Sequence, residues 1–436
     1  MAQADQASMR SQVGECYPDR STVCRLCLLV TPLRVPKSEI TAMKKVAVLG
    51  GGPAGAFAAE RLARAGMETV VLDEKLAWEK PCGGGLTYKA YSRYPFLLEN
   101  SVPKKIVSET CLAAPRSGAV KMDLGRPLVI YSRMDLNRML LDRAEQAGAQ
   151  LEKTRVLGIE RGGRGWRLKT RHGMLDADFC IVATGARNSL RNVGTEWTAA
   201  DTMYALGYFV PSAQNHIDIQ FLPNLEGYIW VFPRCGHLSV GICGKGESAQ
   251  SLRLRLERYM NEKGISYKDA SFYGHMLPSL EHSGWKNNRL AGDGWMAVGD
   301  AGGLVDPITG EGLYYAMRSG DLASQMVMND SLSLAERAQA YRTLLRRDFM
   351  ADLEFGATLA KRVFLGRFLF STVPSRMIDF IRRSPRFQSL IEDLFAGTQP
   401  YLDLKGRLLK NLNGTLQEVI MNLFLQRVIP ATEPRP

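Results

Sequence analysis

One segment near the start of the chain constrains the fold more than any other. Four apolar residues, Val46 to Leu49, are followed by glycines spaced as G-x-G-x-x-G, and then by a helical pattern. A short apolar run of this kind is typical of a buried parallel strand. A second apolar run, from Thr69 to Leu72, ends at Asp73. The segment therefore predicts a strand–helix–strand unit with a dinucleotide site at its first turn.

The three glycines have different physical tasks at such a turn. Gly50 permits the tight turn, Gly52 lets the backbone approach a pyrophosphate, and Gly55 lets the helix pack closely on the strand. The first helical residues, with Ala54 among them, offer free N–H groups and the positive end of the helix dipole to the diphosphate.

An acid at the end of the second strand completes the pattern. Asp73 is placed to accept hydrogen bonds from the ribose hydroxyls of an adenosine, and Glu74 is the neighbouring candidate.

Two later segments favour FAD over NAD. Residues 177–186 read as a strand that ends in Ala-Thr-Gly at Gly185, and residues 294–301 read as a strand that places Asp300 at its end. An Asp in that position can bind ribityl hydroxyls. The glycine-rich residues that follow open a helix whose N–H groups can face a flavin ring edge that becomes anionic on reduction. Their candidate cofactor residues are Pro307, Gly310 and Gly312.

The order of these motifs, GGGPAG, ATG, GDA and PITGEG, resembles the glutathione-reductase-type FAD fold in its p-hydroxybenzoate hydroxylase-like branch. The resemblance runs from Lys44 to the C-terminus. Residues 131–138 are similar to the segment that precedes a long helix in this branch. The resemblance implies that Arg133 contacts FAD.

Two further motifs narrow the resemblance to the geranylgeranyl reductase family. Residues 81–86 read PCGGGL and residues 227–233 read GYIWVFP. The family has a Cys-Gly-Gly-Gly-type loop near the flavin and a Y-x-W-x-F-P motif, and it saturates isolated double bonds of polyprenyl chains. This implies catalytic roles for Cys82, Tyr228 and Trp230.

The second motif also has a direct physical interpretation. Tyr228, Trp230 and Phe232 fall on one face of a strand at period two, where three aromatic rings can wall an apolar substrate channel. An isolated alkene has no carbonyl to polarise, so catalysis depends on position. We expect hydride transfer from the reduced flavin to one alkene carbon and a proton to the other, with Tyr228 and Cys82 as candidate donors.

The sequence shows no second domain that would bind an electron donor such as NADPH. No second glycine motif joins a strand to a helix, because the glycines at 162–165 fit a hairpin turn. The donor is therefore expected to bind transiently, as NADPH or as reduced ferredoxin.

Three alternative functions stay open. An FAD-dependent aromatic monooxygenase shares the fold. A flavin-dependent halogenase carries a similar W-x-W-x-I-P motif, but Tyr228 and Phe232 stand here in place of its first Trp and its Ile. A membrane-bound flavoprotein without turnover would leave the Cys-Gly-Gly-Gly loop unexplained.

Charge is concentrated toward the C-terminus. The net charge is +12, and residues 337–436, with 16 basic and 9 acidic side chains, carry +7 of it. Apolar residues at helical spacing predict a helical region, with stripes at 353–368 and 380–395 and a third at 404–428. Its basic face is either solvated or bound to an anionic membrane. No nucleic-acid-binding signature accompanies the charge.

The first 42 residues look separate from the rest. They are polar and irregular, and Met43 directly precedes the first strand, as a natural start codon would. Cys16, Cys24 and Cys27 have part of a zinc spacing but lack a fourth ligand, so no metal is expected. No run approaches the ~20 apolar residues that span a bilayer, which favours a cytoplasmic protein, with peripheral attachment to the inner face of the membrane as the alternative.

The expected architecture is α/β, with a Rossmann-like FAD-binding domain, an inserted mixed β-sheet substrate domain and a C-terminal helical region. Residues 1–42 would form a flexible leader or a non-native extension. The other expected divisions are residues 43–90, 131–190 and 285–335 for the FAD-binding domain, 91–130 and 191–284 for the substrate domain, and 336–436 for the helical region.

Overall fold

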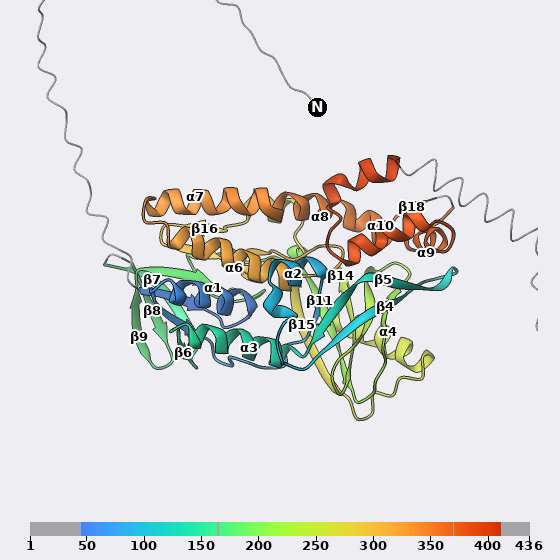
Figure 1. Cartoon of the computed structure of the whole chain (residues 1–436), viewed down its shortest axis with the longest axis horizontal. Helices are drawn as coiled ribbons and strands as arrows, with labels where there is room; N and C mark the ends of the chain where they lie inside the picture. The colour runs from blue at the N-terminus through green and yellow to red at the C-terminus, as the bar shows by residue number, and fades with distance from the viewer. Residues whose placement is uncertain (1–44, 164, 369, 411–436) are drawn as a thin grey trace, which may run out of the picture. The chain divides into compact units, whose positions relative to one another are not determined.

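In the computed structural model of the chain, the nucleotide-binding motif follows a central strand of a mainly parallel sheet, at the carboxyl ends of its strands (Figure 1). The structure describes residues 45–163, 165–368 and 370–410. The predicted leader at 1–42, the candidate start Met43 and most of the third apolar stripe lie outside the described residues.

The first sheet has six strands, and its central strands are buried and parallel, as their apolar sequences predict. In sheet order the strands are β16 (Ala291–Gly292), β17 (Trp295–Ala297), β10 (Phe179–Val182), β1 (Lys45–Leu49), β2 (Glu68–Leu72) and β6 (Gln150–Glu152). The four segments that carry the predicted FAD motifs thus bring their carboxyl ends to one edge of a sheet, where open α/β sheets bind ligands.

Helices cover this sheet in layers. The helix α1 (Pro53–Arg64) packs against α3 (Arg133–Gln146) and α6 (Leu313–Val327), and α7 (Leu334–Leu345) lies on α6 (Figure 1). A small antiparallel sheet also belongs to this part and consists of β7 (Val156–Gly162), β8 (Gly165–Thr170) and β9 (Gly173–Ala177). The hairpin expected at the glycines of 162–165 is therefore present.

The second sheet is mixed, with eight strands. In order they are β15 (Ser271–Pro278), β11 (Thr202–Val210), β14 (Leu238–Lys245), β13 (Glu226–Pro233), β12 (Ile217–Phe221), β4 (Lys104–Ala114), β5 (Gly118–Tyr131) and β3 (Gly85–Leu86). The pair β12–β4 is parallel and the other pairs are antiparallel. The predicted fold class is confirmed, although β3 belongs to this sheet and lies within 43–90, the segment that we assigned to the FAD-binding domain.

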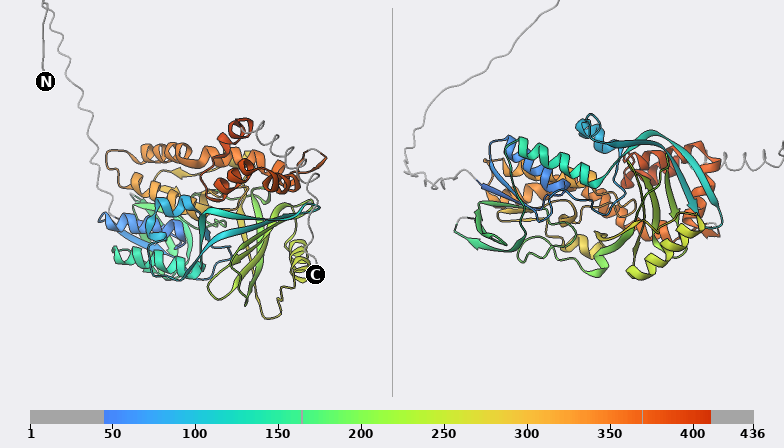
Figure 2. Two further views of the ribbon diagram at one scale, coloured as in Figure 1. Left: turned by 45° about the vertical axis from the view of Figure 1, so that its right-hand side comes forward. Right: turned by 90° about the horizontal axis from the view of Figure 1, so that it is seen from below.

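Each face of the second sheet buries a separate core. On β13, Ile229 and Val231 join the core beneath α4 (Ala249–Glu262), whereas Trp230 joins the core on the opposite face. The C-terminal helices α8 (Ala351–Leu365), α9 (Val373–Arg383) and α10 (Pro385–Phe395) cover that opposite face (Figure 2). The two faces follow from the period-two alternation of strand side chains.

The C-terminal region is helical as expected, with one correction. The first predicted stripe continued as a helix to Phe368, but α8 ends at Leu365 and Phe368 lies in the strand β18 (Arg367–Phe368). The strand pairs with β19 (Ser371–Thr372) in a hairpin. Gly366 interrupts the helix, because its extended backbone (φ −68°, ψ 160°) turns the chain out of the helical path.

Two further short α-helices are α2 (Tyr88–Arg93) and α5 (His282–Asn287). Short 3-10 helices lie at Pro95–Leu97, Ala199–Asp201 and Gly299–Gly302, and a π-helical turn lies at Arg346–Met350. Among the described residues, no helix has both the length and the apolar character needed to cross a bilayer.

Candidate functional site

The glycine motif between β1 and α1 forms a tight turn. It is crowded at Gly50 and Gly55 and open to free space at Gly52. Gly50 has a φ of +120°, and a Cβ there would lie 2.2 Å from the carbonyl oxygen of Ala183. A Cβ on Gly55 would lie 2.0 Å from the oxygen of Gly50, whereas a Cβ on Gly52 would meet nothing within 4 Å. The backbone at Gly52 therefore faces free space, as a close approach to a pyrophosphate requires.

The acid at the end of β2 is engaged with the same turn. One oxygen of Asp73 accepts from the N–H of Gly51 at 2.7 Å, and the other accepts from the N–H groups of Lys75 and Leu76. A carboxylate has about four acceptor sites, so ribose hydroxyls can still bind. Glu74 is directed to Arg155 and Arg171 on the surface, which makes Asp73 the stronger candidate.

Arg133 begins α3, as the resemblance implies, and is buried beside the turn. Its Nη2 donates to Asn137 at 3.3 Å, while its Nε is buried without a hydrogen-bond partner in the structure. A buried donor without a partner is costly, so it indicates a place for an acceptor from a ligand. Gly185, at φ +79°, also has free space where a Cβ would be.

Asp300 follows β17 and forms an ion pair that the sequence did not predict. Lys80 donates to its Oδ2 at 3.1 Å. Burial alone would raise the pKa of Asp300, but the positive charge of Lys80 lowers it below its usual value. Burial and the same lysine lower the pKa of His275, which is therefore neutral near pH 7. Asp300 can offer its remaining lone pairs to ribityl hydroxyls.

A cavity of about 410 Å³ collects most of the predicted site residues. The predicted residues that line it are Gly52, Ala54, Cys82, Arg133, Gly185, Tyr228, Trp230, Phe232, Asp300, Gly310 and Gly312. Gly50, Gly55, Asp73, Glu74 and Pro307 do not line it. One cavity thus joins the predicted cofactor motifs to the aromatic strand.

The aromatic side chains of β13 form one wall of the cavity, as the alternation predicts. Trp230 lies over Gly241 so closely that a Cβ there would meet its ring at 2.2 Å, and its Nε1 donates to Ser239. Tyr228 donates to the carbonyl oxygen of Thr309. Apolar residues from the same sheet face and from the C-terminal helices continue this wall, including Leu112, Ile219, Phe364, Ile391 and Leu394.

The Cys-Gly-Gly-Gly loop packs on the ring of Phe232. A Cβ on Gly83 or on Gly85 would lie 3.1–3.2 Å from that ring, so glycine permits the contact. Arg234 is fully buried and donates to the carbonyl oxygen of Cys82, while its other nitrogen pairs with Glu79. The loop is therefore held against the aromatic strand.

The pKa of the Cys82 thiol lies below its usual value. Burial alone would raise this pKa, but Arg133, Arg234 and the N–H of Gly84, which donates to Sγ at 3.3 Å, outweigh burial. Cys243 lines the same cavity, and burial raises its pKa to about 11. Cys82 is the more readily ionised of the two.

The loop between Asp306 and Gly312 carries two acids, of which Asp306 is buried and Glu311 is partly buried. Asp306 accepts from the N–H groups of Ile308 and Thr309 at 2.9 Å and from the hydroxyl of Tyr401. This bond ties the C-terminal region to the predicted flavin loop.

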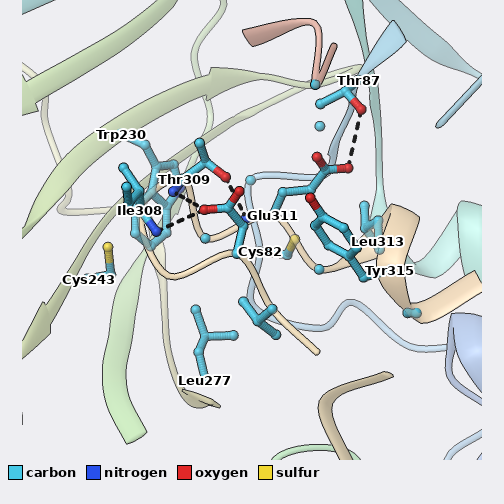
Figure 3. Close-up of a pocket in the computed structure, with 18 of the residues that line it drawn as sticks. Cys82, Thr87, Trp230, Cys243, Leu277, Ile308, Thr309, Glu311, Leu313 and Tyr315 are labelled. Atoms are coloured by element: carbon cyan, nitrogen blue, oxygen red, sulfur yellow. Dashed lines mark hydrogen bonds between the residues drawn. The ribbon is translucent and has the colours of Figure 1, made fainter. Parts of the chain in front are cut away.

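Glu311 is the second acid and lines the cavity. It accepts a hydrogen bond from Thr87 at 3.3 Å (Figure 3). Burial and the nearby charge of Asp306 raise its pKa to about 7, against the opposing effect of Lys89. Glu311 therefore holds a proton at higher pH than an ordinary glutamate does.

Several of these residues were missed at the sequence level, namely Glu79, Lys80, Arg234, His275 and Glu311. Glu311 stands within the quoted PITGEG motif, which was a usable signal, whereas the other four are brought in by tertiary contacts. In the part of the chain that the structure describes, no group of three or more His, Cys, Asp or Glu side chains could hold a metal.

The residues fit FAD. The free space at Gly52 and Gly185 can admit the cofactor, the unpartnered Nε of Arg133 can donate to it, and Asp300 can accept from it. Fold and site together define an FAD-dependent oxidoreductase.

Comparison with known proteins places the chain within this class. Residues 44–208 match the family described as pyridine nucleotide-disulphide oxidoreductase. The chain is 30% identical over 355 residues to the chloroplastic geranylgeranyl diphosphate reductase of Oryza sativa subsp. japonica, covering 70% of this chain and 72% of that one. It is 28% identical over 364 residues to menaquinone reductase of Mycobacterium tuberculosis (strain ATCC 25618 / H37Rv), covering 76% and 87%. The chain belongs to the geranylgeranyl reductase family.

Solved structures agree on the fold. A geranylgeranyl bacteriochlorophyll reductase-like protein from Thermoplasma acidophilum superposes with a TM-score of 0.70 at 20% identity, covering 84% of this chain and 98% of that one. The flavin-dependent brominase Bmp2 superposes with a TM-score of 0.62 at 15% identity, covering 81% and 93%. The fold is thus shared between reductases and halogenases and does not choose between them.

Proposed function

We propose that the protein reduces isolated double bonds in a polyprenyl chain. The observation that carries the proposal is the continuity of the cavity, which runs from the glycines of the cofactor motifs to an apolar wall of Trp230, Phe364 and Leu394. A long apolar substrate needs such a wall next to the reactive cofactor. The substrates in the names of its relatives, geranylgeranyl diphosphate and menaquinone, both carry polyprenyl chains.

FAD, when bound, supplies the hydride. The chain's own residues bind the cofactor, keep water out and hold a proton. Tyr228, Trp230 and Phe232 position the alkene, and the cavity excludes water from it. FAD contacts within the cavity are assigned to Gly52, Ala54, Arg133, Gly185, Asp300, Gly310 and Gly312. Asp73 is assigned to the ribose of the adenosine, Gly50 and Gly55 shape the turn beside it, and Pro307 stays a candidate of the flavin loop.

Glu311 is assigned as the proton donor, in place of Tyr228 and Cys82, which were expected from the sequence. The low pKa of Cys82 favours a thiolate, and the high pKa of Tyr228, which burial raises, makes its phenol a weak acid. The carboxyl of Glu311 has a pKa near the working pH, which is the best compromise for a general acid. Cys82 then acts by orienting the alkene or the cofactor.

The electron donor is external, as NADPH or reduced ferredoxin.

Halogenases need a lysine between two active sites, and two lysines line the cavity. Lys80 is paired with Asp300, and Lys89 lies over the ring of Tyr314 at 4.6 Å. The preference for the reductase therefore rests on Tyr228 and Phe232, which stand in place of the first Trp and the Ile of the halogenase motif.

The test is anaerobic. The flavin is reduced with dithionite, geranylgeranyl diphosphate or a polyprenyl quinone is added, and mass spectrometry follows the lipid. A gain of two hydrogens per double bond is expected. An unchanged lipid with a hydroperoxide on admission of oxygen would favour the monooxygenase, and halogenation of an added aromatic in the presence of halide would favour the halogenase.

A matched pair of variants tests the wall. Trp230→Ala should lower turnover about tenfold or more while FAD is retained, because it removes an aromatic surface that positions the chain. Phe272→Ala removes a half-exposed aromatic ring from β15 of the same sheet, outside the cavity, and should leave turnover unchanged. Unchanged turnover in Trp230→Ala would refute the assignment of the wall.

A further inference from the structure

The hairpin between α8 and α9 exposes a group of large apolar side chains. Phe370 is 99% exposed, Phe368 is 50% exposed and Leu365 is 40% exposed. All three lie within six residues at the end of one helix and in a two-stranded turn. Scattered exposed apolar residues are ordinary, but a contiguous group of this kind marks an interaction surface.

Phe370 is held in an unusual backbone conformation. Its φ is +65°, which a residue with a Cβ rarely adopts. Such a conformation is unfavourable unless surrounding structure imposes it, and it recurs at functional positions. Here the β18–β19 turn imposes it and leaves the ring in water.

The apolar surface continues from the hairpin onto the C-terminal helices. The rings of Phe368 and Phe380 lie 6.4 Å apart between centroids, and Phe380 and Phe387 lie 5.4 Å apart. Phe380 and Phe387 are half-buried, so the band becomes less exposed as it leaves the hairpin.

The charge at the hairpin end of this band is positive, whereas Asp379, beside Phe380, pairs with Arg376 and Arg382. Residues 355–378 contain four basic side chains and no acidic one. Three of the four, Lys361, Arg362 and Arg367, are exposed and flank the hairpin. Exposed aromatic side chains surrounded by basic ones complement a bilayer with anionic head groups, since the rings enter the interface and the cations meet the phosphates.

The inner faces of the same elements line the cavity. Val363 and Phe364, in the last turn of α8, and Met377 of α9 contribute to its apolar wall on either side of the exposed hairpin in the sequence. A membrane bound at the hairpin would therefore lie close to the part of the cavity that takes an apolar chain.

We propose that residues 361–368 and Phe370 form a wedge that inserts into the surface of an anionic lipid bilayer. Phe368 and Phe370 enter the acyl boundary, and Lys361, Arg362 and Arg367 bind the head groups. Insertion of the wedge would bring the cavity next to the bilayer, where a polyprenyl lipid could enter it. This last step rests on the proposed function.

Vesicle sedimentation with the FAD-loaded full chain tests the wedge. Binding is expected to vesicles of phosphatidylcholine mixed with phosphatidylglycerol, and to fall when the phosphatidylglycerol is omitted or salt is raised. The double variant Phe368→Ser/Phe370→Ser should lower the vesicle partition coefficient about tenfold or more. Ile106→Ser/Leu254→Ser removes two side chains that are each 60% exposed elsewhere, and should bind as the unaltered protein does.

Turnover separates this proposal from the proposed function. The Phe368→Ser/Phe370→Ser variant should reduce a detergent-dispersed prenyl lipid normally and a vesicle-embedded one slowly. Equal vesicle binding by the variant and the unaltered protein would overturn the wedge, whether or not any lipid is reduced. A second outcome would also overturn the wedge: vesicles bind neither the variant nor the unaltered protein, and the hairpin substitutions dissociate a dimer. The exposed surface would then be covered by a second copy of the chain.

Discussion

The guanidinium of Arg234 donates to the carbonyl oxygen of Cys82, although the two residues stand 152 positions apart in the chain. The same side chain pairs with Glu79, which accepts from the N–H groups of Arg133 and Met134 at the start of α3. One buried arginine thereby joins the aromatic strand, the glycine loop and the helix that carries the flavin-contact candidate.

Removal of this arginine should destabilise the protein. Arg234→Met leaves Glu79 and the carbonyl of Cys82 without a partner, and we expect a loss of about 3 kcal/mol in the free energy of unfolding. Urea unfolding of the holoprotein measures it. Arg167→Met is the control, because its pair with Asp176 is exposed to solvent and should contribute little to stability. A loss no larger than that of the control would contradict the role of Arg234.

Two glycines of the nucleotide motif should respond differently to alanine. In Gly52→Ala the new Cβ enters free space, so the apoprotein should lose at most about 1 kcal/mol, the cost of alanine at a helix N-cap, while FAD binding weakens. In Gly55→Ala the Cβ would meet the oxygen of Gly50 at 2.0 Å, which should cost about 3 kcal/mol of stability. Thermal unfolding and the flavin content after purification distinguish the two. Full flavin content in Gly52→Ala would show that the free space is not the cofactor site.

The pH dependence of turnover should report Glu311. Its pKa is raised to about 7, so the acid form prevails at lower pH and is lost as pH rises through about 7. If this carboxyl delivers the proton, kcat/KM should fall over that range. Glu311→Gln should lower turnover about 10²-fold and remove this limb of the profile. Glu99→Gln, at an exposed position, should keep the original profile. An unchanged limb in Glu311→Gln would assign the titration to another group.

Two cysteines of one cavity should differ in reactivity. Arginine charges lower the pKa of Cys82, whereas burial raises that of Cys243 to about 11. Iodoacetamide at pH 8, followed by peptide mass spectrometry, should therefore modify Cys82 about tenfold faster or more. Exposed Cys235 serves as the reference for an accessible thiol. Equal rates for Cys82 and Cys243 would mean that the arginines do not stabilise a thiolate.

Much of the fold could be predicted because its signals are local. The apolar run at 46–49, the glycine spacing and the acid at 73 lie within one strand–helix–strand unit, whose backbone geometry depends on neighbours in sequence. The alternation of Tyr228, Trp230 and Phe232 predicted a shared strand face for the same reason. The family resemblance added the prenyl chain.

Local patterns also misled in one place. The stripe that ends at Phe368 has helical spacing, but Gly366 breaks the helix and the next residues form a hairpin. Periodicity does not record where a helix stops, because a single residue with an extended backbone ends it without changing the apolar pattern.

The sequence by itself determined the strand–helix–strand unit, the glycine turn and the aromatic face of β13, since each depends on residues a few positions apart. Only the tertiary structure decided that Lys80 meets Asp300, that Arg234 holds Cys82, that Tyr401 reaches Asp306 and that burial moves the pKa of Glu311 toward 7. Those contacts join residues separated by 95 to 220 positions. They arise from how two sheets and the C-terminal helices enclose one cavity, and burial there sets charges that no local pattern encodes.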